Sequence, residues 1–361
     1  MEKKLKVGIL GATGMVGQRF AILVENHPWY EVTTLAASAN SAGKTYEEAC
    51  GSRWKMTVPM PEKLKNIVLK DVSDVADVAA GVDFLFSAVN MTKDEIKAIE
   101  EEYAKTETPV VSNNSAHRWT PDVPMIIPEI NPQHAEIIPF QKKRLGTTRG
   151  FIAVKPNCSI QSYTPCIAAW TEFAPSKVVV TTYQAISGAG KTFRDWPEME
   201  GNIIPYIGGE EEKSEMEPLK IFGHIEDGVI VRGTSPIITS QCIRVPVLNG
   251  HTAATFISFD GKPTKEQLIE RLRSFSGEPQ KLQLPSAPEH FIQYLEDDNR
   301  PQVRLDVEYE RGMGVSIGRL REDRIFDWKF VGLSHNTVRG AAGGAVECAE
   351  LLTAYRFIQP K

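Results

Sequence analysis

A glycine-rich turn near the amino end constrains the fold of this chain more than any other feature. Residues 5–10 form an apolar run typical of a buried strand, and residues 11–17 follow at once with Gly-Ala-Thr-Gly-Met-Val-Gly. A helical pattern comes next. Gly11 allows a tight turn, Gly14 lets backbone N–H groups approach a pyrophosphate, and Gly17 permits close packing of the helix on the strand.

The spacing of these glycines is GxxGxxG, whereas the dinucleotide fingerprint is GxGxxG. A glycine turn that binds no ligand is therefore the alternative interpretation. Because a strand precedes the turn and a helix follows it, the context favours dinucleotide binding. The sequence predicts a Rossmann-like domain at this end of the chain.

The residues after the second predicted strand indicate which cofactor binds. Folds that prefer NAD place Asp or Glu near the end of this strand, where the carboxylate binds the ribose 2′-hydroxyl. Here the strand at 31–37 is followed by Ser38, Ser41 and Lys44, without a carboxylate. Hydroxyl groups and a lysine suit a 2′-phosphate, so NADP is predicted. A plain polar loop is the alternative.

Alternating strands and helices continue through the first third of the chain. Strands are predicted at 82–89 and 109–112, and Thr92 with Glu95 forms a capping box that opens a helix to about Ala104. Such alternation is typical of a parallel, doubly wound sheet.

The polar loop at 113–118 follows one of these strands and ends in Arg118. Ligands bind at the carboxyl ends of parallel strands. Arg118 is therefore predicted to bind an anion, and a solvated surface arginine is the alternative. The proline-rich segment 121–139 predicts an ordered connection without helix.

The pattern changes after residue 173. Residues 196–236 are acidic and irregular, and a helix is predicted at 265–275. Alternation and tight turns predict strands at 177–183, 243–247, 253–259, 303–310, 314–320 and 325–333. The last helix, at about 338–357, is expected to return to the first domain.

These patterns predict an α/β protein with two domains. Residues 1–156, joined by the C-terminal segment 335–361, form the Rossmann-like dinucleotide-binding domain. Residues 157–334 form an α+β catalytic and dimerisation domain with a largely antiparallel or mixed sheet. A large one-sided sheet often packs against a copy of itself, which predicts a homodimer or a homotetramer.

A cysteine that follows Pro-Asn is the candidate nucleophile. Residues 155–161 read Lys-Pro-Asn-Cys-Ser-Ile-Gln, and an apolar helical pattern runs over 159–173. Pro156 suits a chain that enters a turn, which places Cys158 at a predicted helix N-terminus. There the dipole and the free N–H groups favour a thiolate and could hold an oxyanion. The alternative is a buried cysteine that packs as a small apolar residue.

Composition limits the partners and the compartment. The chain has 361 residues and a net charge of −5, which favours neither a nucleic-acid nor a membrane partner. Its five cysteines are scattered and form no CxxC pair, so neither a disulfide framework nor a metal site is predicted. With no signal-peptide segment before the first strand and no apolar run long enough to cross a bilayer, a cytoplasmic location is expected.

Seven motifs, in order along nearly the whole chain, resemble the aspartate-β-semialdehyde dehydrogenase family: GATGMVG, SNNSAHR, PNCSIQ, YQAISGAG, EEEK, RVPVLNGH and NTVRGAAGGA. The longer SNNSAHRWTPDVPMIIPEINPQH and the NCSIQ variant resemble its archaeal and fungal-type branch. The resemblance implies reversible NADPH-dependent reduction of aspartyl-4-phosphate to aspartate semialdehyde, with release of phosphate. It places this reaction in lysine, threonine and methionine biosynthesis.

The resemblance also implies roles for individual residues. The catalytic set is Cys158 as nucleophile, His251 as acid/base and Gln184 as the residue that orients the substrate. The substrate and phosphate set is Arg118, Asn157, Glu210, Lys213 and Arg244. The cofactor set is Gly11, Thr13, Gly14, Met15, Val16, Ser38, Ser41, Ser187, Gly188 and Asn336.

Within the substrate set, Arg244 would bind the substrate carboxylate and Glu210 would face its amino group. The segment between these two residues is longer than in the bacterial branch, so Glu211 is the alternative to Glu210.

The reduction of an acyl phosphate requires the same residue types. A thiolate must displace phosphate to form a thioester, a hydride must reach the thioester carbon, and a histidine must hold a proton near neutral pH. The nearest rival reading is a malonyl-CoA or other acyl-CoA reductase of the same family, which would need no phosphate site. N-acetyl-glutamyl-phosphate reductase matches less well around the cysteine and the histidine. A dinucleotide sensor without catalysis would not need the cysteine, the histidine and the anion-binding residues together.

Overall fold

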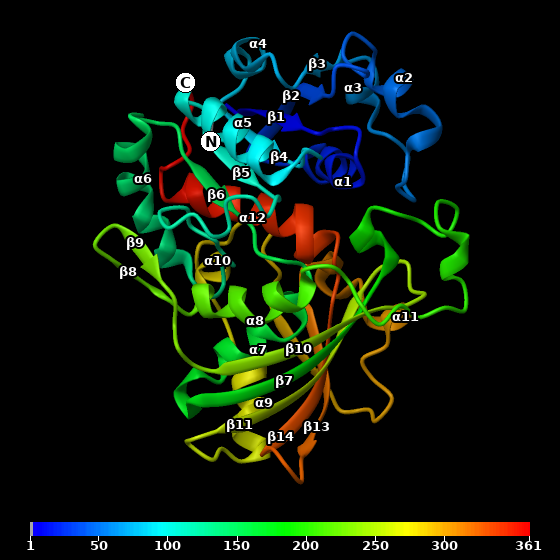
Figure 1. The fold of residues 1–361 in the computed structure, drawn as a ribbon, viewed down its shortest axis with the longest axis vertical. Helices are drawn as coiled ribbons and strands as arrows, with labels where there is room; N and C mark the ends of the chain where they lie inside the picture. Colours follow the sequence, from blue (N-terminus) through cyan, green and yellow to red (C-terminus); the bar gives the residue numbers. More distant parts are fainter. Residues whose placement is uncertain (1–2) are drawn as a thin grey trace.

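The computed structural model describes residues 3–361, which fold around two six-stranded sheets (Figure 1). The first sheet is entirely parallel and has the strand order β3-β2-β1-β4-β5-β6. Its strands are β1 Leu5–Leu10, β2 Tyr30–Ala37, β3 Lys70–Asp71, β4 Phe84–Ser87, β5 Val110–Ser112 and β6 Ile152–Val154. The predicted Rossmann-like sheet is confirmed.

Helices cover both faces of this sheet. They are α1 Met15–Val24, α2 Tyr46–Cys50, α3 Glu62–Lys65, α4 Val75–Ala80, α5 Lys93–Lys105, α6 Ile138–Leu145 and α12 Gly343–Ala354. Phe84 and Phe86 of β4 pack with α1 and α12, whereas Leu85 packs with α5 on the opposite face. Successive side chains of a strand point to opposite faces, so a strand covered on both sides is apolar throughout.

The second sheet is mixed and has the strand order β10-β7-β11-β14-β13-β12. Its strands are β7 Pro175–Gln184, β10 Ile237–Arg244, β11 His251–Phe259, β12 Ile292–Leu295, β13 Val315–Glu322 and β14 Trp328–Ser334. β7 pairs parallel with β10 and β12 pairs parallel with β13, while the central pairs are antiparallel. The prediction of a mixed sheet is confirmed.

Within residues 3–361, helices cover one face of this second sheet and leave the other open. α7 Thr164–Ala169 and α9 Lys265–Ser274 pack on it through the same apolar core that lies behind α5. On the other face, side chains of β7 and β10 such as Tyr183 and Ile237 are exposed.

A charged helix lies between the two sheets where an irregular segment was predicted (Figure 1). Within 196–236 the chain forms α8 Glu210–Ile221 and the hairpin of β8 His224–Glu226 and β9 Val229–Val231. α8 packs on β10 and on the turn after Cys158. Three of its charged side chains, Glu210, Glu217 and Lys220, are buried against the protein, so the helix shows no apolar stripe in the sequence.

A second error concerns the segment at 303–310, which was predicted to be a strand. It forms the short helix α11 Val303–Asp306, followed by a 3₁₀ turn at Tyr309–Gly312. Asp306 stabilises this turn because its carboxylate pairs with Arg300 and accepts the backbone N–H of Gln302. The strand that pairs with β13 at this edge of the sheet is β12, which was not predicted. The small helix α10 Glu278–Lys281 precedes it.

Two further segments differ from the predictions. The strand expected at 243–247 is β10, which begins six residues earlier, at Ile237, and ends at Arg244 because Pro246 lacks the N–H that a ladder needs. The proline-rich stretch 121–139 holds a 3₁₀ turn at Pro132–Ile137 and the start of α6, since proline is tolerated in the first turn of a helix.

Candidate active site

Cys158 lies between the two sheets, shortly after β6 ends. It begins a 3₁₀ turn at Ser159–Ser162 that contacts β11 and β14. A Cβ atom at Gly340 would lie 2.8 Å from the Cβ of Cys158, so glycine is required for the C-terminal segment to approach the cysteine. The helix predicted over 159–173 is broken into this turn, α7 and a second 3₁₀ turn, so Cys158 does not cap an α-helix.

His251 is the first residue of β11 and points at Cys158. Its Nε2 lies 3.3 Å from the sulfur of Cys158, and the imidazole is fully buried. The other ring nitrogen, Nδ1, accepts the backbone N–H of Ala185 at 3.0 Å. A neutral imidazole has one N–H, so this contact places the proton on Nε2, facing the sulfur.

Burial keeps both partners of this pair uncharged. It raises the pKa of Cys158 to about 11, and Glu210 acts in the same direction, while Lys155, Arg118 and Arg244 oppose it. Burial, assisted by Arg244, lowers the pKa of His251 to about 3. The expectation that a helix dipole favours the thiolate is therefore wrong for this site: desolvation outweighs the short turn.

The sulfur faces a cavity of about 460 Å³ whose wall carries several charged and amide side chains. Predicted site residues that line it are Val16, Arg118, Asn157, Cys158, Gln184, Ser187, Gly188, Glu210, Lys213, Arg244 and Asn336. His251 lies behind the wall, next to Cys158 and within 3.2 Å of a Cβ built on Gly188. The fold thus brings together residues from β7, β10, α8, α1 and the C-terminal segment.

Two buried polar side chains from neighbouring strands border the cavity beside Gly188. Arg244 ends β10, and its Nη1 donates to the carbonyl of Ala185 at 2.6 Å. Gln184 ends β7, and its amide donates to Thr182 at 3.2 Å. The remaining donors of the Arg244 guanidinium are available to a carboxylate.

Arg118 reaches the cavity from the loop after β5 and is almost fully buried. Its Nη1 donates to Glu217 at 2.9 Å and its Nε to the carbonyl of Lys155 at 3.0 Å. A third contact goes to the carbonyl of Asn113. These contacts fix the guanidinium while two of its five N–H groups keep no partner among residues 3–361, which suits an anion site.

Glu210 opens α8 and holds two of the predicted residues. Its carboxylate accepts Lys213 at 2.7 Å and the amide of Asn157 at 3.0 and 3.1 Å. Lys213 lowers the pKa of Glu210 against the opposing effect of burial. Glu211 turns the other way, toward the backbone of β10 at Cys242, so the structure places Glu210 in the cavity.

Residues assigned to the cofactor lie in two groups. Ser187 and Asn336 meet at 2.8 Å beside the cavity, and the Asn336 carbonyl accepts the backbone N–H of Gly250 at 2.8 Å. The second group, outside the cavity wall, contains Gly11, Thr13, Gly14 and Met15 in the β1–α1 turn, with Ser38 and Ser41 after β2.

The β1–α1 turn has the shape that a pyrophosphate requires. Gly11 has a φ of +77°, and a Cβ on it would lie 2.3 Å from the carbonyl oxygen of Ala88. A Cβ on Gly14 would meet only the Gly11 carbonyl, at 3.5 Å, so the outer side of the turn is open. No acidic residue stands in the first turn of α1 to repel an anion.

Neither a metal-binding cluster nor a membrane-spanning helix occurs within residues 3–361. No group of three or more His, Cys, Asp or Glu side chains has an arrangement that could hold a metal ion. No helix in this part of the chain has the length and apolar character needed to cross a membrane.

Known families and proteins match the whole chain. A semialdehyde dehydrogenase NAD-binding domain model matches residues 6–138, and a semialdehyde dehydrogenase dimerisation domain model matches 167–339. The aspartate-semialdehyde dehydrogenase of Methanothermobacter thermautotrophicus is 43% identical over 355 residues, which cover 96% of this chain and 99% of that protein. The chain belongs to the aspartate-semialdehyde dehydrogenase family.

Fungal members of the family are similarly close. The aspartate-semialdehyde dehydrogenase of Aspergillus fumigatus is 40% identical over 364 residues, covering 98% of this chain and 99% of that protein. The crystal structure of the Candida albicans enzyme, determined with NADP, superimposes with a TM-score of 0.88 at 36% identity and covers 99% of this chain and 100% of that chain. The predicted family is confirmed, and archaeal and fungal members are among its relatives.

Two buried charged residues beside the cavity were not predicted from the sequence. Glu217 pairs with Arg118 and also accepts the backbone N–H of Asn157 at 2.6 Å. Its spacing of seven residues from Glu210 on α8, one helical face, is the signal that could have found it. Lys155, buried beneath Cys158, lay inside the motif but received no role.

Proposed function

We propose that this protein is an NADP-dependent aspartate-semialdehyde dehydrogenase. It reduces aspartyl-4-phosphate to aspartate semialdehyde, reversibly, through a thioester on Cys158, in the biosynthesis of lysine, threonine and methionine. The observation that carries the proposal is the contact of 3.3 Å between Cys158 and His251 beside a cavity with cationic side chains. Family membership supports the substrate and the pathway.

The fit of the β1–α1 turn to a pyrophosphate supports NADP as the cofactor, as do the NAD-binding domain match and the NADP of the Candida albicans relative. Gly11 to Val16 would hold the pyrophosphate, and Ser38 with Ser41 the 2′-phosphate. Ser187, Gly188 and Asn336 lie where the reactive end would meet the cavity. When bound, the cofactor supplies a hydride to the carbon that is attached to the sulfur.

The substrate is held by charged side chains in the cavity wall. Arg244 binds its carboxylate, and Glu210 faces its amino group. Arg118 and Lys213 bind the phosphate, and Asn157 helps to orient it. Arg118 is well suited to this role because its contacts with Glu217 and Lys155 fix the guanidinium in one orientation.

In the first chemical step, the thiolate of Cys158 attacks the acyl carbon. A carbon–sulfur bond forms, the bond between carbon and the phosphate oxygen breaks, and phosphate leaves with the electron pair. The N–H at Nε2 of His251 points at the sulfur and stabilises its negative charge. Gln184, at the end of β7, orients the carbonyl group.

His251 acts as the acid of the second step. After hydride transfer the substrate oxygen carries the negative charge, and the N–H at Nε2 stabilises that charge by donating a hydrogen bond to the oxygen. When the carbon–sulfur bond breaks, the oxygen's electron pair forms the carbonyl again and the sulfur leaves as a thiolate with the bonding pair. Burial keeps the imidazole neutral, with its one proton at Nε2.

An acyl-CoA reductase is the rival activity, and a steady-state assay separates the two. Purified protein is supplied with aspartate semialdehyde and NADP, and NADPH is followed at 340 nm. We expect turnover with phosphate or arsenate and none with CoA alone. Turnover that requires CoA and ignores phosphate would overturn the proposal. The conversion of Arg118 to Leu or Lys213 to Met should raise the KM for phosphate more than that for semialdehyde.

Three further parts of the proposal concern organisation. The first domain comprises 1–156 with the segment 335–361, and the second 157–334.

The family assembles through its dimerisation domain, and the open face of the second sheet, which includes Ile237 at 68% exposure, supports a homodimer. Light scattering of the wild type distinguishes a dimer from a tetramer. An Ile237→Arg variant should have a lower molecular mass if this face forms the interface. The cysteines within 3–361 form no disulfide, in line with a cytoplasmic location.

A further inference from the structure

Lys155 is a buried lysine without a carboxylate partner. Its side chain is about 2% exposed, and its ammonium nitrogen makes one hydrogen bond within residues 3–361, to the carbonyl of Pro156 at 2.9 Å. Glu217, the carboxylate whose charge acts on it, pairs with Arg118 instead. Buried charges are normally paired, so an unpaired lysine next to an active site indicates a function.

The C-terminal segment packs against both Cys158 and Lys155. A Cβ on Gly340 would lie 2.8 Å from Cβ of Cys158, and a Cβ on Gly344 would lie 2.9 Å from Cε of Lys155. The same segment therefore covers the cysteine and the lysine, which are three residues apart in the chain. The cavity wall does not include Lys155, so the lysine supports the sulfur from behind.

The other cations near Cys158 have different tasks. Arg118 and Arg244 line the cavity, where the two anionic groups of the proposed substrate would neutralise them. His251 presents an N–H to the sulfur and cannot accept the thiol proton at Nε2 in that form. Three cations lower the pKa of Cys158: Lys155, Arg118 and Arg244. Of these, Lys155 alone lies outside the cavity wall, where the substrate would not contact it.

We infer that Lys155 is a positioning residue that stabilises the thiolate of Cys158 by taking up one proton as the thiol loses one. The buried pair changes from thiol and amine to thiolate and ammonium, so the proton is conserved and the net charge of the site does not change. Without the lysine, ionisation would leave an uncompensated negative charge in a buried place. The inference rests on the proposed use of Cys158 as a nucleophile.

The surroundings support this exchange. Burial lowers the pKa of Lys155 to about 7, so the amine and the ammonium are both accessible near neutral pH. Lys155 is also the largest influence that lowers the pKa of Cys158. The charged or titratable groups that act on Lys155 or on which it acts are Cys158, Arg118 from the loop after β5, Glu217 from α8, and Arg339 and Cys348 from the C-terminal segment.

The test measures alkylation of Cys158 by iodoacetamide as a function of pH, without substrate or turnover. The other four cysteines are buried, and peptide mass spectrometry reports Cys158 alone. In Lys155→Met the midpoint of the alkylation profile should rise by about one pH unit or more, which is roughly tenfold slower labelling at pH 7. Lys155→Arg should keep the midpoint at or below the wild-type value.

Lys142→Met is the matched control, because Lys142 is a half-buried lysine on α6 away from the cavity, and its profile should equal that of the wild type. Lys155→Gln replaces Lys155→Met if the latter does not fold. A profile of the folded neutral variant that superimposes on the wild type would overturn the inference. Absence of phosphate-dependent turnover in the wild type would instead refute the proposed function, so the two failures are distinguishable.

Discussion

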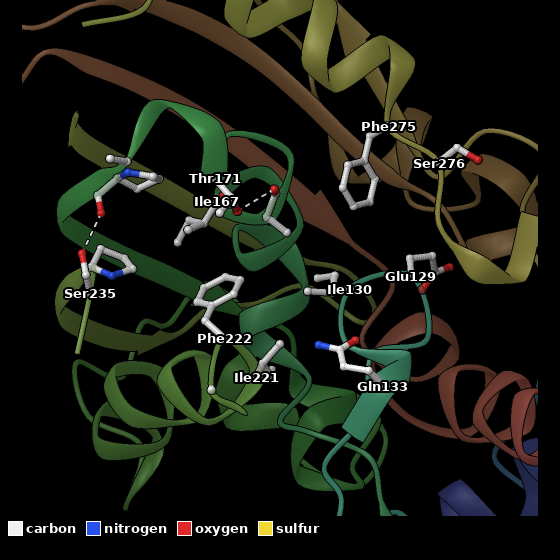
Figure 2. A pocket seen from close by; sticks show the side chains of 15 residues that line it. Glu129, Ile130, Gln133, Ile167, Thr171, Ile221, Phe222, Ser235, Phe275 and Ser276 are labelled. Atoms are coloured by element: carbon white, nitrogen blue, oxygen red, sulfur yellow. Dashed lines mark hydrogen bonds between the residues drawn. The ribbon is translucent and has the colours of Figure 1, made fainter. Parts of the chain in front are cut away.

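Two cavities of similar size in this molecule differ in what lines them. The cavity at Cys158 has a volume of about 460 Å³ and a wall that carries Arg118, Lys213 and Arg244. The second has about 500 Å³ and lies near the end of α8, where Figure 2 shows Phe222, Ile167 and other apolar side chains.

Several polar groups of the second cavity already have partners. Ser235 donates to the carbonyl of Pro175 and Thr171 donates to the carbonyl of Ala168 (Figure 2), while Glu129 pairs with Arg339 outside the wall. At Cys158, by contrast, Arg118 and Arg244 have guanidinium N–H groups without a partner among residues 3–361. The comparison teaches that cavity volume does not identify a site; polar groups with unused bonding capacity do.

Among the variants considered, removal of the nucleophile Cys158 should cause the largest loss of catalytic activity. Cys158→Ala should lower kcat by at least about a thousandfold, because a covalent step has no substitute, while NADP binding persists. Cys166→Ala, a buried cysteine of α7 beside the second cavity, should retain activity. Near-wild-type kcat in Cys158→Ala would refute the thioester.

The histidine should have the next largest effect. His251→Ala should lower kcat by about a hundredfold or more with little change in KM, because the N–H at Nε2 stabilises the negative charge on the substrate oxygen in the second step. Kinetics at saturating semialdehyde and phosphate provide the measurement. A change in KM alone would make His251 a binding residue and contradict the assigned role.

A smaller loss is expected at the substrate carboxylate. Arg244→Lys replaces a planar fork with a point charge, so the KM for semialdehyde should rise about tenfold, or ~1.4 kcal/mol, with kcat nearly unchanged. The guanidinium also contacts the Ala185 carbonyl, so the variant's melting temperature should be recorded alongside. An unaltered KM would remove Arg244 from the substrate site.

Substitution in the second cavity should show the opposite pattern. Ile221 is 1% exposed and belongs to the main apolar core, so Ile221→Ala should lower the free energy of unfolding by about 2–5 kcal/mol. Activity per folded protein should stay within about twofold of the wild type. If Ile221→Ala abolished activity without loss of stability, the second cavity would take part in catalysis, and the contrast between the two cavities would be wrong.

Local patterns were sufficient to predict four of the six strands of the first sheet, β1, β2, β4 and β5, but not the short β3 and β6. The turn at Gly11 has the positive φ expected of a glycine turn, and the capping box at Thr92 is formed as predicted. The active-site residues could be assigned because they stand in contiguous motifs. Whether Cys158 and His251 meet could not be read from the sequence, since their contact depends on the packing of β11 against the turn after β6.

α8 and 303–310 show where local patterns fail. α8 buries Glu210, Glu217 and Lys220, so its inner face is charged and periodic hydrophobicity is absent. The β-branched start of 303–310 suggests a strand, but the ion pair of Asp306 with Arg300 stabilises a helical turn. In both cases, interactions between side chains decide the conformation. The sequence alone does not show which charged residues pair in the folded protein.

A single-turnover experiment tests the central claim most directly. The protein is mixed with NADP and aspartate semialdehyde without phosphate, and NADPH formation and the mass of the Cys158 peptide are followed together. We predict a burst of about one NADPH per protomer, an aspartyl adduct on Cys158, and continued turnover only after phosphate is added. Sustained turnover without phosphate, or a burst that leaves Cys158 unmodified, would contradict the account.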